Sequence, residues 1–400
     1  MNLPYFISNR ISTPKAGTFS STIHKVAIFS IGIGLTVMIL AFAIMQGFKN
    51  TIKNKIYDFS GHIQITKYVS ANAYNENPLK LPDTLHLDGI KNIVPFAFKA
   101  GLLQTNEEVE GVVFKGVGRS FDSTEFKQYL KAGRFIHFKD SSYSTEVIIS
   151  RHLANRLKLK VGGSLIMHFF QDPPRARKLT IVGIYETGME DFDNKIMVGD
   201  IGLAQRLNDW ADGYAGGFEV YVNNVDQIDA VQQRLYDTYG YDYYVQKTSH
   251  KFLQVFEWLS LIDNNVNILL FMVLFVASFN MISIILILIL ERTPMIGTLK
   301  ALGAQNGLIR KIFVYNGMQL IVKGLIVGNV LGLGLALLQW KFKFITLDPS
   351  NYYMDYVPIE FNFWILILLN LLVMGLVSAI LILPTLFVSR VEPIKAIKFD

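Results

Sequence analysis

Long stretches of this chain carry no charged side chain, and they restrict its fold more than any other feature. Residues 26–48, 264–290 and 361–389 contain 23, 27 and 29 consecutive uncharged residues. About 20 apolar residues span the hydrocarbon core of a bilayer, so each stretch is long enough to cross a membrane. A fourth stretch, 324–340, has 17 residues, but Lys323 can reach the interface and let this helix begin earlier. The sequence therefore predicts four transmembrane helices.

The remaining residues form one long polar insertion and several short connections. The predicted fold class is a membrane protein with four transmembrane α-helices and a large mixed α+β extracytoplasmic domain between helices 1 and 2. The predicted order is an N-terminal interfacial segment (1–25), helix 1 (26–48), the inserted domain (49–262), helix 2 (266–290), a loop (291–311), helix 3 (318–340), an outer loop (341–362), helix 4 (363–388) and a tail (389–400).

Composition agrees with a membrane protein and excludes several soluble classes. The chain is 51% hydrophobic and 18% charged, whereas soluble domains carry about 25% charged residues. Because it has no cysteine, it can form neither a disulfide scaffold nor a cysteine-ligated metal or iron–sulfur site.

Lysine and arginine predict the orientation. Residues 1–25 and loop 291–311 each carry a net charge of +3, the tail 389–400 carries +1, and the insertion 49–262 sums to zero. Short loops rich in these residues stay in the cytoplasm. Both termini and loop 291–311 are therefore expected inside, and the insertion outside. Ala41-Phe42-Ala43 resembles a signal-peptidase site, but the apolar run continues past it, so we expect helix 1 to be retained.

The insertion is predicted to mix strands and helices. Alternating or β-branched runs predict strands at 62–66, 112–115, 146–150, 165–170, 178–185 and 217–222. Helices are predicted at 151–159, 201–207 and 225–239, the last with Asn224 as its N-cap and Gly240 at its end. Five tyrosines gather near that end, either as a binding surface or as a half-buried corner between helix and strand: Tyr236, Tyr239, Tyr241, Tyr243 and Tyr244.

The sequence lacks the motifs of common catalytic and metal sites. It has no Gly-Lys dipeptide and hence no Walker A loop, and it has neither H-E-x-x-H nor G-x-S-x-G. The acidic group Glu190, Asp191 and Asp193 lacks EF-hand spacing and is expected to be a solvated turn. We therefore expect a non-catalytic protein without a metal or a directly bound cofactor, driven by a partner if it performs work.

A short helix is predicted directly after helix 2. Thr293 is a suitable N-cap, Pro294 suits the first helical position, and Gly303 can stop the helix after about nine residues. Met295, Leu299 and Leu302 fall on one face, with Ile296 beside them. So short a helix is marginal alone, which favours a docking helix for another protein over a connector lying on lipid headgroups.

These residues carry a resemblance to a known family. The segment 291–304 resembles the coupling helix of ABC-type permeases, and its matching residues are Glu291, Arg292, Thr293, Met295, Ile296, Gly297, Leu299, Lys300, Leu302 and Gly303. Segments 276–283, 352–360, 390–397 and 45–48 resemble the lipoprotein-releasing (LolC/LolE) branch of the FtsX-like and MacB-like permease superfamily.

The resemblance implies a bacterial inner-membrane permease with defined partners. These would be a cytoplasmic ABC ATPase dimer that uses ATP and Mg, a second permease chain, a periplasmic lipoprotein chaperone and lipoprotein substrates. In the family a loop of the soluble domain hooks the chaperone. Its counterpart here, 171–177, is shorter and offers Pro173, Pro174, Arg175 and Arg177, so a plain β-turn with surface arginines is the alternative.

Two further groups of residues fit such a permease. Gly324, Gly328 and Gly332 share one face of helix 3 and predict close helix packing. A possible lipid entry consists of Ile44, Met45 and Phe48 on helix 1 with Phe271, Met272 and Phe275 on helix 2. The predicted function is lipoprotein release; the alternatives are a cell-division-type scaffold that transmits ATPase motion without transport, and a drug or peptide exporter. Homodimer and heterodimer both remain open.

Overall fold

The protein consists of two compact units. The computed structural model describes residues 3–11, 19–68, 77–80, 88–105, 108–139, 142–348 and 352–386. The helical unit comprises Met1–Lys49, Trp258–Ile345 and Val357–Asp400, and the sheet unit comprises Asn50–Glu257 and Thr346–Tyr356. The predicted tail, its 390–397 motif and the last residues of predicted helix 4 lie outside the described residues.

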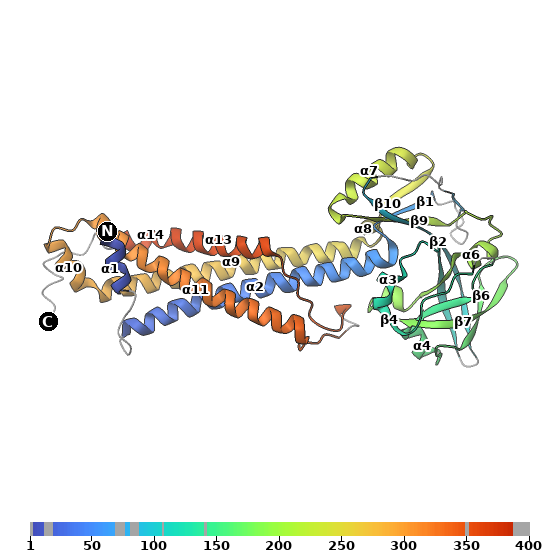
Figure 1. Ribbon diagram of the computed structural model, residues 1–400, viewed down its shortest axis with the longest axis horizontal. Coiled ribbons are helices and arrows are strands. Elements are labelled where there is room, and N and C mark those ends of the chain that lie inside the picture. Colours follow the sequence, from blue (N-terminus) through green and yellow to red (C-terminus); the bar gives the residue numbers. More distant parts are fainter. Residues whose placement is uncertain are drawn as a thin grey trace. The chain divides into compact units, whose positions relative to one another are not determined.

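Long apolar helices build the helical unit (Figure 1). Among the described residues, four helical segments are long and apolar enough to cross a membrane. They are α2 (Phe19–Ser60), α9 (Leu253–Glu291), α11 (Asn306–Phe342), and α13 (Phe363–Ile380) with its continuation α14 (Ile382–Thr385). Two short helices accompany them, α1 (Leu3–Ile11) and α10 (Thr293–Ala301).

Three of the long helices extend well beyond their predicted bounds. α2 has 42 residues instead of the predicted 23, which corresponds to about 63 Å of helix, twice the thickness of the hydrocarbon core. α11 begins at Asn306, inside the predicted loop 291–311. Charged residues locate the point where a helix leaves the hydrocarbon, but they do not end the helix. The predicted bounds follow the charge-free stretches, and the helical extensions beyond them were not predicted.

Small residues bring α11 against α2. A Cβ added to Gly324 would lie 2.8 Å from the side chain of Ile31, and one on Gly328 would lie 2.8 Å from Gly32 O. Gly332 faces Ile39 in the same way, at 3.1 Å. The glycine face predicted on helix 3 thus packs within this chain, where it allows the two backbones to approach closely.

Polar side chains join the helices at intervals. The amides of Asn329 on α11 and Asn370 on α13 donate to each other's oxygen, at 2.7 and 3.1 Å. Asn280 Nδ2 on α9 donates to Ser30 Oγ on α2 at 2.9 Å. Such hydrogen bonds hold helices together in lipid, where apolar contact alone gives little preference.

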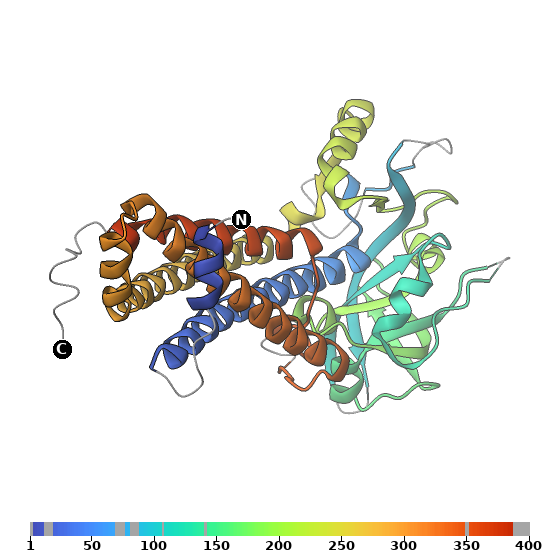
Figure 2. The same cartoon turned by 60° about the vertical axis from the view of Figure 1, so that its left-hand side comes forward.

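The helix α1 packs on α11, as both views show (Figure 2). The rings of Tyr5 and Tyr315 meet edge to face with centroids 5.9 Å apart. Leu3 and Phe6 are about half exposed, with 49% and 46% of their surface accessible. An apolar exposed side on a short N-terminal helix is compatible with the predicted interfacial segment.

The sheet unit is built on a ten-stranded sheet. Its order is β10-β1-β9-β2-β3-β8-β5-β7-β4, and β6 pairs with β2 and β7. The strands are β1 (Ile63–Lys67), β2 (Ile90–Gln104), β3 (Val109–Val117), β4 (Leu130–Gly133), β5 (Glu146–Ser150), β6 (Ser164–Phe169), β7 (Arg175–Tyr185), β8 (Ile196–Asp200), β9 (Gly217–Val222) and β10 (Tyr243–Lys247). The short helices are α3 (Ser123–Phe126), α4 (Arg151–Arg156), α5 (Glu190–Asp193), α6 (Ile201–Leu207), α7 (Ile228–Tyr239) and α8 (Thr248–Lys251), with 3-10 turns η1 (Lys127–Tyr129) and η2 (Val225–Gln227).

Sequence patterns located many of these elements but not all of them. The predicted strands 146–150 and 217–222 and the predicted helix 201–207 are confirmed with the same bounds. β2, β4, β8 and β10 were not predicted from the sequence. Of the five clustered tyrosines, Tyr239 and Tyr243 form the half-buried corner, whereas Tyr241 is 99% exposed.

The acidic segment 190–193 is not the solvated turn that was predicted. It forms α5, and its Asp193 is buried. The Asp193 carboxylate accepts hydrogen bonds from Thr187 N and Oγ1 and from Gly188 N, at 2.8–3.2 Å. Burial raises the pKa of this carboxyl group, and the hydrogen bonds from Thr187 oppose that shift. The acid therefore organises a turn, which a count of charges along the sequence does not reveal.

A buried ion pair ties the end of α2 to the sheet. Lys115 on β3 and Glu219 on β9 are 2% and 0% exposed, and Lys115 Nζ lies 2.8 Å from Glu219 Oε1. The same ammonium donates to Phe59 O near the C-terminus of α2. The last turn of α2 is thus bonded to an ion pair that is buried in the sheet unit.

Candidate functional site

The first part of the candidate site is the junction of α9 and α10. α9 ends at Glu291 and α10 begins at Thr293, so a single residue separates two helices. Thr293 is not the predicted N-cap. Its Oγ1 donates backwards to Leu290 O at 2.7 Å, because no extended residue precedes α10. Arg292 takes the cap position without a side-chain cap.

The end of α10 agrees with the prediction. The N–H of Gly303 donates to Lys300 O at 3.0 Å, and the N–H of Ala304 donates to Leu299 O at 2.9 Å. Gly303 has a φ of +88°, so these two bonds form a Schellman motif with glycine in the left-handed position. The nine-residue length and the glycine stop are confirmed.

The apolar stripe of α10 is covered by the helical unit itself. Ile296 is fully buried and shares a cluster with Ile309 and Phe313. Met295 and Leu299 are partly buried against the same cluster. The expectation that another protein must cover this stripe is therefore wrong, because a helical period identifies an apolar face without identifying what packs on it.

The opposite face of α10 is the accessible one. Leu302 keeps 80% of its surface exposed. Pro294, Thr298 and Ala301 are also exposed, and the spacing of these four residues places them on one side of the helix. Of the other matching residues, Glu291 and Gly303 are exposed, Arg292, Thr293 and Lys300 are half-buried, and Gly297 is buried.

An apolar groove between α2 and α9 forms the second part. It has a volume of about 730 Å³, within the range of ligand pockets. Its lining residues are mostly apolar and comprise Thr22, Lys25, Val26, Phe29, Ser30, Ile33, Gly34, Val37, Met272, Val273, Val276 and Ala277. Only Met272 of the predicted lipid-entry residues belongs to it.

The structure places Phe48 of the predicted lipid entry at a different level from Phe271. α2 and α9 run antiparallel, with Gly34 close to Val273 and Lys49 bonded to Asp263. Phe48 therefore meets Trp258, at a centroid distance of 5.6 Å. The exposed Phe271 lies 13 residues along α9 from Trp258, which is roughly 20 Å of helix. The predicted pairing of Phe48 with Phe271 is therefore wrong, because the register of two antiparallel helices cannot be read from either sequence pattern alone.

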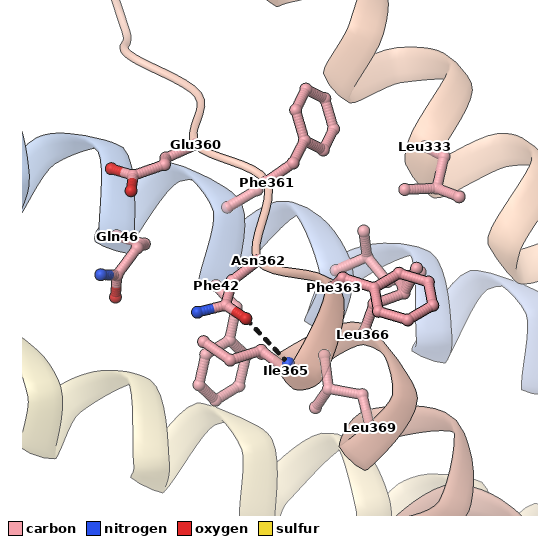
Figure 3. Close-up of a pocket in the computed structure, with 12 residues that line it drawn as sticks. Phe42, Gln46, Leu333, Glu360, Phe361, Asn362, Phe363, Ile365, Leu366 and Leu369 are labelled. Carbon is pink, nitrogen blue, oxygen red and sulfur yellow. Dashed lines mark hydrogen bonds between the residues drawn. The ribbon is translucent and has the colours of Figure 1, made fainter.

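A second pocket, which the sequence analysis did not identify, lies between α2, α11 and α13 (Figure 3). Its volume is about 210 Å³. Figure 3 shows Gln46 and Glu360 at one end and Leu333, Leu366 and Leu369 at the other. Asn362 caps α13 by accepting from the N–H groups of Trp364 and Ile365 at 3.0 and 3.3 Å. An asparagine directly before an apolar run is a typical helix cap, and it was the feature of the sequence that could have indicated this end of α13. The pocket can hold an apolar chain with a polar group at its mouth.

The predicted chaperone loop is a tight connection between β6 and β7. Pro173 and Pro174 are exposed, but Arg175 and Arg177 already belong to β7. Arg175 makes two bonds with the carboxylate of Asp209, at 2.8 and 3.2 Å, and this pairing lowers the pKa of Asp209. Arg175 therefore ties the hairpin to Asp209, the second residue after α6. Arg177, with its NH1 donating to Ala176 O, remains half-buried on the strand.

Within the described ranges, no three His, Cys, Asp or Glu side chains gather as a metal ion would require.

Two known families match different parts of the chain. Residues 26–237 match the MacB-like periplasmic core domain, and residues 267–393 match the FtsX-like permease C-terminal domain. The first match covers more than half of the chain. The chain belongs to the MacB-like periplasmic core domain family. Together with the four apolar helices, membership of this MacB-like family identifies an inner-membrane protein with a large periplasmic domain.

Characterised relatives of this MacB-like protein cover nearly its whole length. The lipoprotein-releasing system transmembrane protein LolC of Neisseria meningitidis is 23% identical over 96% of both chains, and LolE of Haemophilus influenzae is 23% identical over 93% of both. The predicted resemblance is confirmed. Among solved structures, the periplasmic region of MacB from Actinobacillus actinomycetemcomitans matches 48% of this chain and 91% of its own length, with 13% identity and a TM-score of 0.35.

Proposed function

We propose that the chain is the permease subunit of an ATP-driven ABC complex that extracts lipoproteins from the inner membrane and passes them to a periplasmic chaperone. The full-length similarity to lipoprotein-releasing transmembrane proteins supports this function. The observation that carries it is the two-sided placement of α10. One side is anchored in the helical unit and the other is exposed, as a coupling element requires.

The proposed ATPase contact is the face of Pro294, Thr298, Ala301 and Leu302. An ATPase dimer on the cytoplasmic side would press on this face, and Ile296 would pass the displacement into the buried cluster. The chain itself would bind no nucleotide; ATP and Mg would be used by the partner. This arrangement requires both termini and α10 to lie in the cytoplasm.

The groove between α2 and α9 is the proposed contact for the acyl chains of the substrate. An acyl chain lifted out of the bilayer would lose about 0.8 kcal/mol for each methylene exposed to water, and an apolar wall that covers the chain avoids that loss. A second permease chain, identical or related, would close the open side of the groove. The smaller pocket beside Glu360 would then be available to membrane lipid or to a further chain of the substrate.

One observation favours a second candidate, a scaffold that transmits ATPase motion without transport. The 171–177 connection is short, and its Arg175 is bonded to Asp209, which leaves Pro173, Pro174 and Arg177 for a chaperone.

Reconstitution separates the two functions. The chain, the ATPase and the second permease chain in liposomes should transfer triacylated lipoprotein to a soluble chaperone when ATP is added. ATP hydrolysis without transfer would favour the scaffold.

The ATPase contact is tested by replacing Leu302 with glutamate. Because Leu302 is 80% exposed, its replacement should leave folding within about 0.5 kcal/mol of wild type. Loss of a central interface contact of about 2 kcal/mol would weaken ATPase capture roughly 30-fold. Val225→Glu, at a 47% exposed position of the sheet unit, is the matched control. Undiminished capture by Leu302→Glu would reject this face as the contact.

A further inference from the structure

The connection between α11 and α13 is attached to the sheet unit. Residues 346–356 belong to that unit, although both helices that they join belong to the helical unit. Thr346 and Tyr356 form an antiparallel bridge, and the N–H of Leu347 donates to Asp355 O at 2.9 Å. Met354 is 5% exposed. The described part of the connection is therefore a docked hairpin with a buried side chain.

Lys55 holds this hairpin from the C-terminal part of α2. Its Nζ donates to Tyr353 O and to Thr187 O, both at 2.5 Å. One ammonium thus joins the hairpin to the turn that precedes α5. All three residues lie in the sheet unit, and a hydrogen bond from a charged donor is roughly twice as strong as one between neutral groups.

Both carbonyl acceptors belong to tightly packed parts of the backbone. The buried Asp193 fixes the Thr187–Gly188 turn through three donors. Gly188 has a φ of +75°, and a Cβ on it would lie 3.0 Å from Tyr353 O. Tyr353 itself adopts a φ of +61°, a conformation that non-glycine residues keep only where surrounding contacts enforce it. The hairpin therefore packs closely against the Thr187–Gly188 turn.

The hairpin matters because the chain passes between the two units at only four points. Two of these passages are α2 and α9, and the other two are the ends of residues 346–356. A connection without contacts to the sheet unit would let α11 and α13 move without displacing the sheet. A connection fixed to the C-terminal part of α2 would transmit that movement.

We propose that Lys55 is a positioning residue that latches the α11–α13 connection to α2, so that movements of α11 and α13 reach the periplasmic sheet. The proposal rests on the proposed function, since it assigns to Lys55 the transmission step of lipoprotein release. The charged groups that act on Lys55 are Asp355, Asp193, Lys131 and Glu186.

The test compares Lys55→Met with Lys55→Arg in the full reconstituted complex. Methionine keeps the length and apolar stem of lysine but removes the donors, whereas arginine keeps donors. Lys127→Met, at an exposed position of η1, is the matched control. We expect Lys55→Met to release lipoprotein about tenfold more slowly while ATP hydrolysis continues, and Lys55→Arg to restore most of the release. Amide exchange in peptides covering 352–356 should be about tenfold faster in Lys55→Met.

Each remaining outcome overturns a defined part of the proposal. Faster exchange with wild-type release would show that the hairpin is anchored but transmits nothing. Unchanged exchange in Lys55→Met would show that Lys55 does not hold the hairpin. If the wild-type complex hydrolyses ATP without releasing lipoprotein, the proposed function fails, and the exchange rates alone then decide whether the latch exists. Lys55→Arg covers the case in which Lys55→Met does not fold.

Discussion

The buried pair of Lys115 and Glu219 allows a quantitative test of what holds the sheet unit together. Replacing Lys115 with methionine leaves the fully buried carboxylate of Glu219 with Gln64 Nε2, at 3.4 Å, as its remaining partner. Breaking a buried pair on one side typically costs about 3–5 kcal/mol. In a domain of this size 1 kcal/mol shifts the melting temperature by about 2–4 °C, so we expect the transition of the sheet unit to fall by roughly 6–20 °C.

The double variant separates the pair from its surroundings. Replacing Lys115 with methionine and Glu219 with leucine removes both charges, and apolar replacement of a buried pair is often neutral or stabilising. Phe59 O then loses its donor, which costs about 1–3 kcal/mol. The double variant should therefore unfold within about 2 kcal/mol of wild type. The assay is thermal unfolding of the full chain in detergent, followed by circular dichroism in the strand region. A double variant no more stable than Lys115→Met would refute the argument.

Two further predictions concern packing and pH. Gly328→Ala should destabilise the helical unit by about 1–3 kcal/mol, because its Cβ would lie 2.8 Å from Gly32 O, whereas Gly334→Ala, with open space around it, should be neutral or slightly stabilising in the same melting assay. Burial, and then nearby Lys91, lower the pKa of His62 to about 4. Since the unfolded chain takes up this proton near pH 6.5, stability should fall by up to about 3 kcal/mol as pH drops from 6.5 to 4, and His62→Gln should lack this part of the pH dependence.

Local signals in the sequence were sufficient for features that depend on a few neighbouring residues. Charge-free stretches gave the four spans, and Gly303 gave the end of α10, because a left-handed stop is a local requirement. The spacing of Gly324, Gly328 and Gly332 likewise indicated a face of close packing.

The remaining features depend on pairs of residues that are distant in sequence. The stripe of Met295 and Leu299 was visible, but its covering by residues such as Phe313 was not. The level of Phe271 relative to Phe48 follows from the antiparallel register of two long helices. Lys115 and Glu219 are separated by 104 residues, and either one alone resembles an ordinary surface charge. The short helix after α9 was predicted at the right place, but the side of it that is accessible was not.

The direct junction between α9 and α10 has a mechanical consequence. Arg292 alone separates the two helices, and α9 continues without interruption from Glu291 back to Leu253. No flexible linker is present along these 39 residues to absorb a force applied at α10. Under the proposed function, a tilt imposed on α10 would pass along one unbroken helix as far as Leu253.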